Sequence, residues 1–112
     1  MTLEEKAPVK LEPIREASAV LVYKEKQFVG FDHTAAYIDV EAWRRENEGA
    51  TENLDLDGYK ELYATAGFLT ESGAYVDRYK AADHARANGQ MANPNAKYLE
   101  SEYLRSMGNK LS

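Results

Sequence analysis

His33 and His84 have the most versatile chemistry in this sequence, since an imidazole can bind a metal or carry a proton. They lie far apart, and neither has the HxxxH or HxxE neighbour that places two ligands on one face of an element. The chain has no cysteine, which excludes a thiolate zinc site, a disulfide and sulfur redox chemistry. We therefore predict neither a metal nor a cofactor, and we expect His33 to contact either a ligand or the backbone.

Patterns for catalysis are missing from the sequence. No serine stands in a GxSxG context, so a Ser-His-Asp triad is not indicated. With 19 acidic residues in 112, chance pairs of carboxylates are inevitable, and such a pair does not indicate acid–base catalysis. Phosphate loops of the GxxxxGK or GxGxxG type do not occur. We predict a protein that is not an enzyme.

Aromatic residues support a binding function better. Phe31, Phe68 and Tyr75 stand beside or near glycines in or next to expected turns, where a ring can line a cleft and stack on a nucleobase. The remaining large aromatic residues are more simply explained as core or interface residues with a polar tip. They include Tyr37, Trp43, Tyr59 and Tyr63.

A second candidate for binding is the start of the helix expected after Asp77. Backbone N–H groups and the helix dipole favour an anion there, and Arg78 and Lys80 add positive charge. Asp77 as N-cap would already place a carboxylate at that end. A well-capped helix with two solvated bases is therefore an equal alternative to an anion site.

Charge is distributed unevenly along the chain. Residues 1–75 carry eight basic and fifteen acidic residues, a net −7, whereas residues 76–112 carry six and four, a net +2. Nucleic acid is an unlikely partner because a basic cluster is missing, but the acidic segment 46–61 could dock on a basic host protein. No run approaches the 18 apolar residues of a membrane helix, and the N-terminal residues lack the apolar core of a signal peptide. We expect a cytoplasmic protein without membrane contact.

The elements that position these residues begin with a hairpin. Residues 1–16 are predicted to form an irregular arm, because Pro8 and Pro13 favour extended geometry, and residues 17–112 a single domain. Apolar runs over 17–24 and 27–30 predict two paired strands. A helix is expected from Asp32 to residue 47, with Ala35, Ile38 and Ala42 at helical spacing. The acidic residues 48–57 predict a mobile surface loop, and residues 58–67 fit a helix or a strand.

The sequence pattern in the second half of the chain predicts its elements more clearly. Residues 67–69 and 74–76 flank a Glu-Ser-Gly turn and predict a tight hairpin, with Gly73 at positive φ. A helix over 78–89 should follow, capped by Asp77 and ended by Asn88 and Gly89. A final short element of uncertain type is expected over 98–107. Together these elements predict an α+β fold, a small antiparallel sheet built from hairpins with helices packed on it.

The order of motifs along the chain resembles a family of small bacteriophage proteins. An F-x-G-x-x-H element is followed by a G-F-L-T-x-x-G-x-Y-V-D-R hairpin, a helix ending A-x-x-x-G-Q, and a terminal L-x-S-E. The match spans about residues 17 to 104. Its residues are Phe28, Gly30 and His33; Gly67, Phe68, Leu69, Thr70, Gly73, Tyr75, Val76, Asp77 and Arg78; Ala85, Gly89 and Gln90; Leu99, Ser101 and Glu102.

This family looks like the one that includes the Thoeris anti-defence proteins, which sequester cyclic ADP-ribose signals. The resemblance implies a phage counter-defence protein, a homo-oligomer that binds a nucleotide-derived immune signal between its subunits without catalysis in the cytoplasm of the infected bacterium. An aromatic ring would stack on the base, and arginine or backbone N–H groups would hold the pyrophosphate. The ligand-binding residues implied are Phe31, His33, Phe68, Thr70, Tyr75, Asp77 and Arg78.

The sequence departs from the family pattern at three positions. Asp32 and Ala74 stand where the family commonly has arginine, and Lys80 stands where an acidic residue is usual. Either Lys80, Arg86 or Arg105 substitutes for the missing bases, or the protein binds something else. The rival prediction is an acidic inhibitor of a host defence complex, of the anti-CRISPR type, that acts through segment 46–61.

Overall fold

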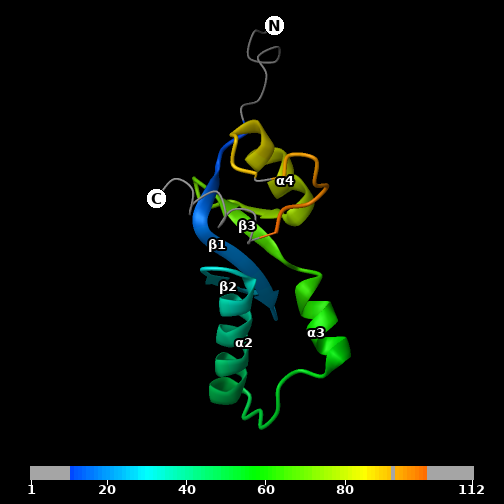
Figure 1. The fold of residues 1–112 in the computed structure, drawn as a ribbon. Helices are drawn as coiled ribbons and strands as arrows, with labels where there is room; N and C mark the ends of the chain where they lie inside the picture. The colour runs from blue at the N-terminus through cyan, green and yellow to red at the C-terminus, as the bar shows by residue number, and fades with distance from the viewer. Residues whose placement is uncertain (1–10, 92, 101–112) are drawn as a thin grey trace, which may run out of the picture.

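The architecture is a four-stranded sheet with helices packed on it, which confirms the predicted α+β class. The computed structural model describes residues 11–91 and 93–100. Within them, the elements follow the order of the chain in Figure 1. They are β1 (Ile14–Tyr23), β2 (Lys26–Gly30), α2 (His33–Asn47), α3 (Leu56–Tyr63), β3 (Gly67–Thr70), β4 (Tyr75–Asp77) and α4 (Arg78–Ala87).

The sheet is antiparallel throughout, in the order β2-β1-β3-β4. Both predicted hairpins are present, because β1 pairs with β2 and β3 pairs with β4. The first strand begins at Ile14 rather than at the expected Ala17, and its pairing with β3 is irregular between Ile14 and Ala19. Ala17 has φ 55°, so a bulge rather than the end of the strand lies there.

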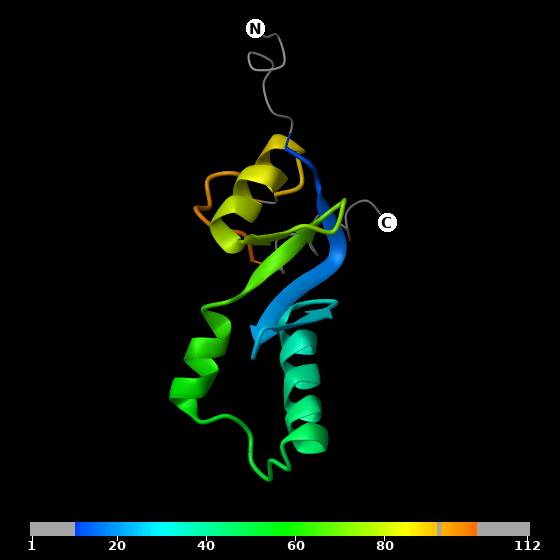
Figure 2. The same cartoon turned by 180° about the vertical axis from the view of Figure 1, so that it is seen from behind.

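Two apolar clusters stabilise the sheet at its two ends. Figures 1 and 2 show α4 at one end of the sheet and α2 with α3 at the other. At one end, α4 packs Ala81, Ala82 and Ala85 against Phe68 and Ala19. At the other end, α2 and α3 enclose a second cluster. Its buried members are Leu21, Phe28, Ala36, Val40, Leu62 and Ala66. No helix in the described part of the chain has the length and apolar character to cross a bilayer.

Aspartate side chains cap all three described helices. Asp32 accepts a hydrogen bond from the backbone N–H of Ala35 at 2.9 Å, and Asp77 accepts one from Lys80 at 2.8 Å, as predicted. Asp55 caps α3 through the N–H of Gly58 at 2.8 Å, which settles the ambiguous segment as a helix that ends before β3. The expected element over 98–107 lies mostly outside the described residues.

The face that α2 turns to the core differs from the apolar stripe read from its sequence. Ala35, Ile38 and Ala42 have helical spacing, but Ile38 is 57% exposed. The buried positions are His33, Ala36, Val40 and Glu41 instead. The hydrophobic periodicity therefore predicted the helix correctly but not the face that it buries. A buried acidic residue such as Glu41 is counted as polar in the sequence pattern, so it does not mark the buried face.

The acidic loop before α3 is anchored, contrary to the predicted mobile loop. The buried carboxylate of Glu41 accepts hydrogen bonds from the Tyr37 hydroxyl at 2.7 Å and from the backbone N–H of Leu54 at 2.9 Å. Arg44 donates to the same carboxylate at 2.6 Å and to the carbonyl of Glu52 at 3.0 Å. These bonds hold residues 52–54 against α2.

Candidate ligand-binding site

The seven predicted site residues separate into a buried and an exposed group. The buried group is His33, Phe68 and Thr70. The group that reaches the surface is Phe31, Tyr75, Asp77 and Arg78. Phe68 is only 1% exposed, so its ring contacts the core and is closed to a nucleobase. Only the second group can contact a ligand in this conformation.

His33 joins α2 to β3. Its Nε2 donates to the carbonyl oxygen of Gly67 at 2.9 Å, and its ring meets Phe68 edge-on with centroids 5.0 Å apart. Burial lowers the pKa of His33; the hydrogen bond to Gly67 acts against this shift, and the positive charge of Arg78 adds to it. Of the two roles expected for this imidazole, the backbone contact is the one formed.

We expect acid to destabilise the protein through His33. Because its folded pKa lies below the ordinary value of 6.5, its stabilisation is complete above pH 6.5 and declines as the pH falls through the folded pKa. Urea unfolding at pH 7.5 and 5.5 measures this loss. His33→Gln should flatten the dependence between those two values, whereas an unchanged slope would place the titrating group elsewhere.

Thr70 closes the β3–β4 turn. Its hydroxyl accepts from the backbone N–H of Ala74 at 3.2 Å, and its own N–H donates to the carbonyl of Ala74 at 2.8 Å. Gly73 has φ 95°, which confirms the predicted left-handed position in this turn. The turn chemistry therefore accounts for Thr70 without a ligand.

Three members of the exposed group, Tyr75, Asp77 and Arg78, lie along β4 and the start of α4, whereas Phe31 precedes α2. The Arg78 guanidinium lies over the ring of Tyr98, 5.1 Å from its centroid, and Tyr98 meets Tyr79 edge-on at 5.8 Å. Leu99 donates from its backbone N–H to the carbonyl of Arg78 at 3.0 Å, which brings Tyr98 to this place. Sequence reasoning missed Tyr79 and Tyr98, although an aromatic residue directly after Arg78 was a usable signal. We call Tyr75, Arg78, Tyr79 and Tyr98 the Arg78 surface.

Tyr75 interacts electrostatically with Arg78, and its hydroxyl is hydrogen-bonded to the backbone just before β3. Burial and the negative charge of Asp77 raise the pKa of Tyr75, and Arg78 counteracts the shift. The hydroxyl donates to the carbonyl of Thr65 at 2.7 Å, so the ring lies across Gly67. Asp77 fills the N-terminus of α4 as its cap, so the capped-helix alternative is the arrangement present.

Gly67 must lack a side chain because Tyr75 and β4 approach it closely. A Cβ there would collide with the carbonyl oxygen of Val76 and lie 2.6 Å from Cε1 of Tyr75. We expect Gly67→Ala to lower the free energy of unfolding by about 2 kcal/mol, since relief requires backbone movement. Thermal unfolding measures it, with Gly49→Ala as control: that site has open space around it and φ 67°, so only the smaller backbone penalty applies. Equal losses would show that crowding at Gly67 is unimportant.

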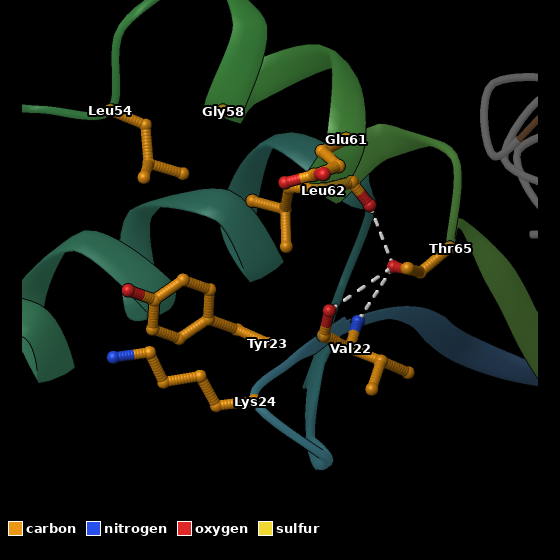
Figure 3. A pocket seen from close by; sticks show the side chains of 8 residues that line it. All are labelled: Val22, Tyr23, Lys24, Leu54, Gly58, Glu61, Leu62 and Thr65. Atoms are coloured by element: carbon orange, nitrogen blue, oxygen red, sulfur yellow. Dashed lines mark hydrogen bonds between the residues drawn. The ribbon is translucent and has the colours of Figure 1, made fainter.

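A separate hollow lies between the turn of the β1–β2 hairpin and α3, the hairpin–α3 groove of Figure 3. Its volume is about 420 Å³, and its apolar lining comes from Val22, Tyr23, Leu54 and Leu62, with the backbone of Val22 facing Thr65 (Figure 3). Lys24 and Glu61 stand on opposite sides of its opening. The sequence did not predict this groove. It forms where the last residues of β1 extend past Gly67, the first residue of β3, and this depends on how the two strands pair.

The fold is that of a small α+β domain, with the Arg78 surface at the start of α4 and the groove beside α3. Groups of three or more metal-binding side chains do not occur among residues 11–91 and 93–100. The chain belongs to the phage T4 y16D protein family, whose model matches residues 17–106. The predicted bacteriophage origin is thereby confirmed. Searches of curated proteins and of solved structures returned no significant match.

Proposed function

We propose that this phage protein binds and sequesters a nucleotide-derived immune signal of the host, of the cyclic ADP-ribose type, without catalysis. The Arg78 surface carries the proposal. A guanidinium binds phosphate oxygens in bidentate fashion, and the exposed rings of Tyr79 and Tyr98 can stack on a base. The signal is held and released unchanged, in the cytoplasm of the infected bacterium.

A homo-oligomer completes this site in our proposal. The carboxylate of Asp77 is next to Arg78 in the chain, and a pyrophosphate carries two negative charges, so one arginine is a weak anchor. A second subunit can supply the further cation and the exposed ring of Phe31, which is 58% exposed. We therefore place the ligand between subunits.

The experiment uses metabolite extract from bacteria whose nucleotide-signalling defence has been triggered. Purified protein is incubated with the extract, washed and heat-denatured, and mass spectrometry identifies what it releases. We expect an intact cyclic nucleotide, lost with Arg78→Ala and weakened with Tyr98→Ala. Lys60→Ala and Tyr59→Ala are matched controls, because Lys60 is an exposed base on α3, away from the Arg78 surface, and Tyr59 is 38% exposed, as Tyr98 is. Release of a cleaved product would indicate an enzyme, and release of nothing by folded protein would contradict binding.

A second candidate function is the acidic inhibitor of a host defence complex. The observation that favours it is the fixed conformation of the acidic loop, which Glu41 and Arg44 hold around a hollow of about 400 Å³ that includes Glu52. Charge reversal at Glu46, Glu52 and Asp57 tests it, since all three are exposed. Asp55 is left unchanged because it caps α3. Loss of counter-defence activity in this variant, with activity kept in Arg78→Ala, would select this function over sequestration.

A further inference from the structure

The hairpin–α3 groove combines apolar walls with an unbalanced charge at its opening. Its volume of about 420 Å³ lies within the range of ligand sites, and Val22, Leu54 and Leu62 make its interior apolar. The hydroxyl of Thr65 at its inner end is occupied, because it donates to the carbonyl of Leu62 at 2.6 Å and accepts from the N–H of Val22 at 2.8 Å (Figure 3). The interior therefore suits an aliphatic group that makes no hydrogen bonds.

The opening attracts positive charge. The ammonium of Lys24 lies 2.6 Å from the carboxylate of Glu48, and this bond raises the pKa of Lys24. Glu61, on the other side, makes no hydrogen bond or ion pair within the described residues. Segment 46–61 as a whole has six acidic residues and one lysine. One neutralised cation and one uncompensated carboxylate give the opening a net negative charge.

Gly58 is a third indication that the groove is kept open. It lies inside α3, where glycine is a poorer helix former than alanine. A Cβ at this position would lie 3.2 Å from Cδ2 of Leu54, a wall of the groove, and 3.2 Å from Oδ1 of Asp55, so these neighbours would have to shift by a few tenths of an ångström. The glycine thus leaves room for Leu54 and for the cavity beside it.

We propose that the hairpin–α3 groove receives a long basic side chain, an arginine, from a protein that docks on the acidic segment 46–61. The aliphatic stem packs on Val22, Leu54 and Leu62, and the guanidinium forms an ion pair with Glu61. An anion is repelled by the surrounding carboxylates, and a purely apolar group leaves Glu61 uncompensated. The inference rests on the second candidate function and names the contact by which the acidic surface selects a partner.

The test follows backbone amide signals by NMR while N-acetyl-arginine amide is added to the full-length protein. The matched probe is N-acetyl-citrulline amide, which has the same shape without the charge. We expect saturable shifts at Val22, Leu62 and Thr65 with the arginine compound, and at least tenfold weaker binding of the citrulline compound. Spermidine, added separately, tests whether a free polyamine is the occupant.

Two variants change the groove without removing its core packing. Glu61→Gln should weaken the arginine compound at least tenfold, whereas Glu71→Gln, the same change at an exposed acid in the β3–β4 turn and outside segment 46–61, should leave binding unchanged. Gly58→Ala should narrow the groove and weaken binding while circular dichroism shows a folded protein, because the helix preference of alanine offsets its close contacts with Leu54 and Asp55.

Three results would overturn the inference: equal affinity for the arginine and citrulline compounds, equal weakening by Glu71→Gln and Glu61→Gln, or tighter binding of spermidine with displacement of the arginine compound. These failures are distinct from failure of the second candidate function. That function fails when charge reversal at Glu46, Glu52 and Asp57 leaves counter-defence activity intact, whatever the groove binds.

Discussion

Phe68→Ala is expected to lower the free energy of unfolding by about 3–5 kcal/mol, the range for removing a buried phenylalanine ring. The ring is 1% exposed and belongs to the cluster that joins β1, β3 and α4. It also packs edge-on against His33, with centroids 5.0 Å apart. Its loss therefore leaves a cavity that borders both sheet and helices. Urea unfolding at pH 7.5, followed by circular dichroism, measures the change.

Phe31→Ala is the matched control, because the same substitution there removes a ring that is 58% exposed. We expect a loss within about 0.5 kcal/mol, as for most surface substitutions. Similar losses at the two positions would contradict the assignment of Phe68 to the core. The comparison also bears on ligand binding: a loss of binding in Phe68→Ala reports unfolding, whereas a loss in folded Phe31→Ala or Tyr98→Ala reports contact.

The local elements were predictable because short-range chemistry determines them. Asp32 and Asp77 cap helices through the backbone three residues ahead, and Gly73 permits the turn that Thr70 closes. Neither the helix caps nor this turn depends on the rest of the fold. The hairpins followed for the same reason, since each pairs strands that are neighbours in the chain.

The candidate site was harder to predict because it depends on contacts distant in the chain. Phe68 and Tyr79 are both aromatic residues near a helix or turn, but pairing of β3 with β1 buries the first, and the second stays 58% exposed. Tyr98 reaches Arg78 only through the backbone bond from Leu99. The hairpin–α3 groove exists because α3 replaces β3 beside the last residues of β1, which spacing alone does not reveal.

Glu41→Leu is expected to lower the free energy of unfolding by about 3 kcal/mol, because it removes the nearer of the two carboxylates beside the largely buried Arg44 and leaves only that of Glu48, at 3.7 Å. The side chain of Arg44 is 15% exposed, and that of Glu41 is 5% exposed. The hydroxyl of Tyr37 and the backbone N–H of Leu54 lose their acceptor as well. Glu46→Gln is the control, since this carboxylate lies on the exposed side of the same helix. A loss below about 1 kcal/mol for Glu41→Leu would contradict a buried, paired carboxylate.

The double variant Glu41→Leu with Arg44→Leu separates the cost of an unpaired charge from the value of the pair. If the unpaired charge dominates, the double variant should recover much of the stability lost by Glu41→Leu, because neither charge is then buried alone. Acid should also lower the free energy of unfolding, as Glu41→Leu does, because it protonates Glu41. Burial raises the pKa of Glu41, but bonds from Tyr37, Leu54 and Arg44 outweigh burial and hold it below the ordinary value of 4.5. The stabilisation by Glu41 is therefore complete above pH 4.5 and is lost as the pH falls through its folded pKa. The decline should be shallower in the double variant, where the carboxylates of Glu12 and Glu48, whose pKa values are also lowered, still contribute.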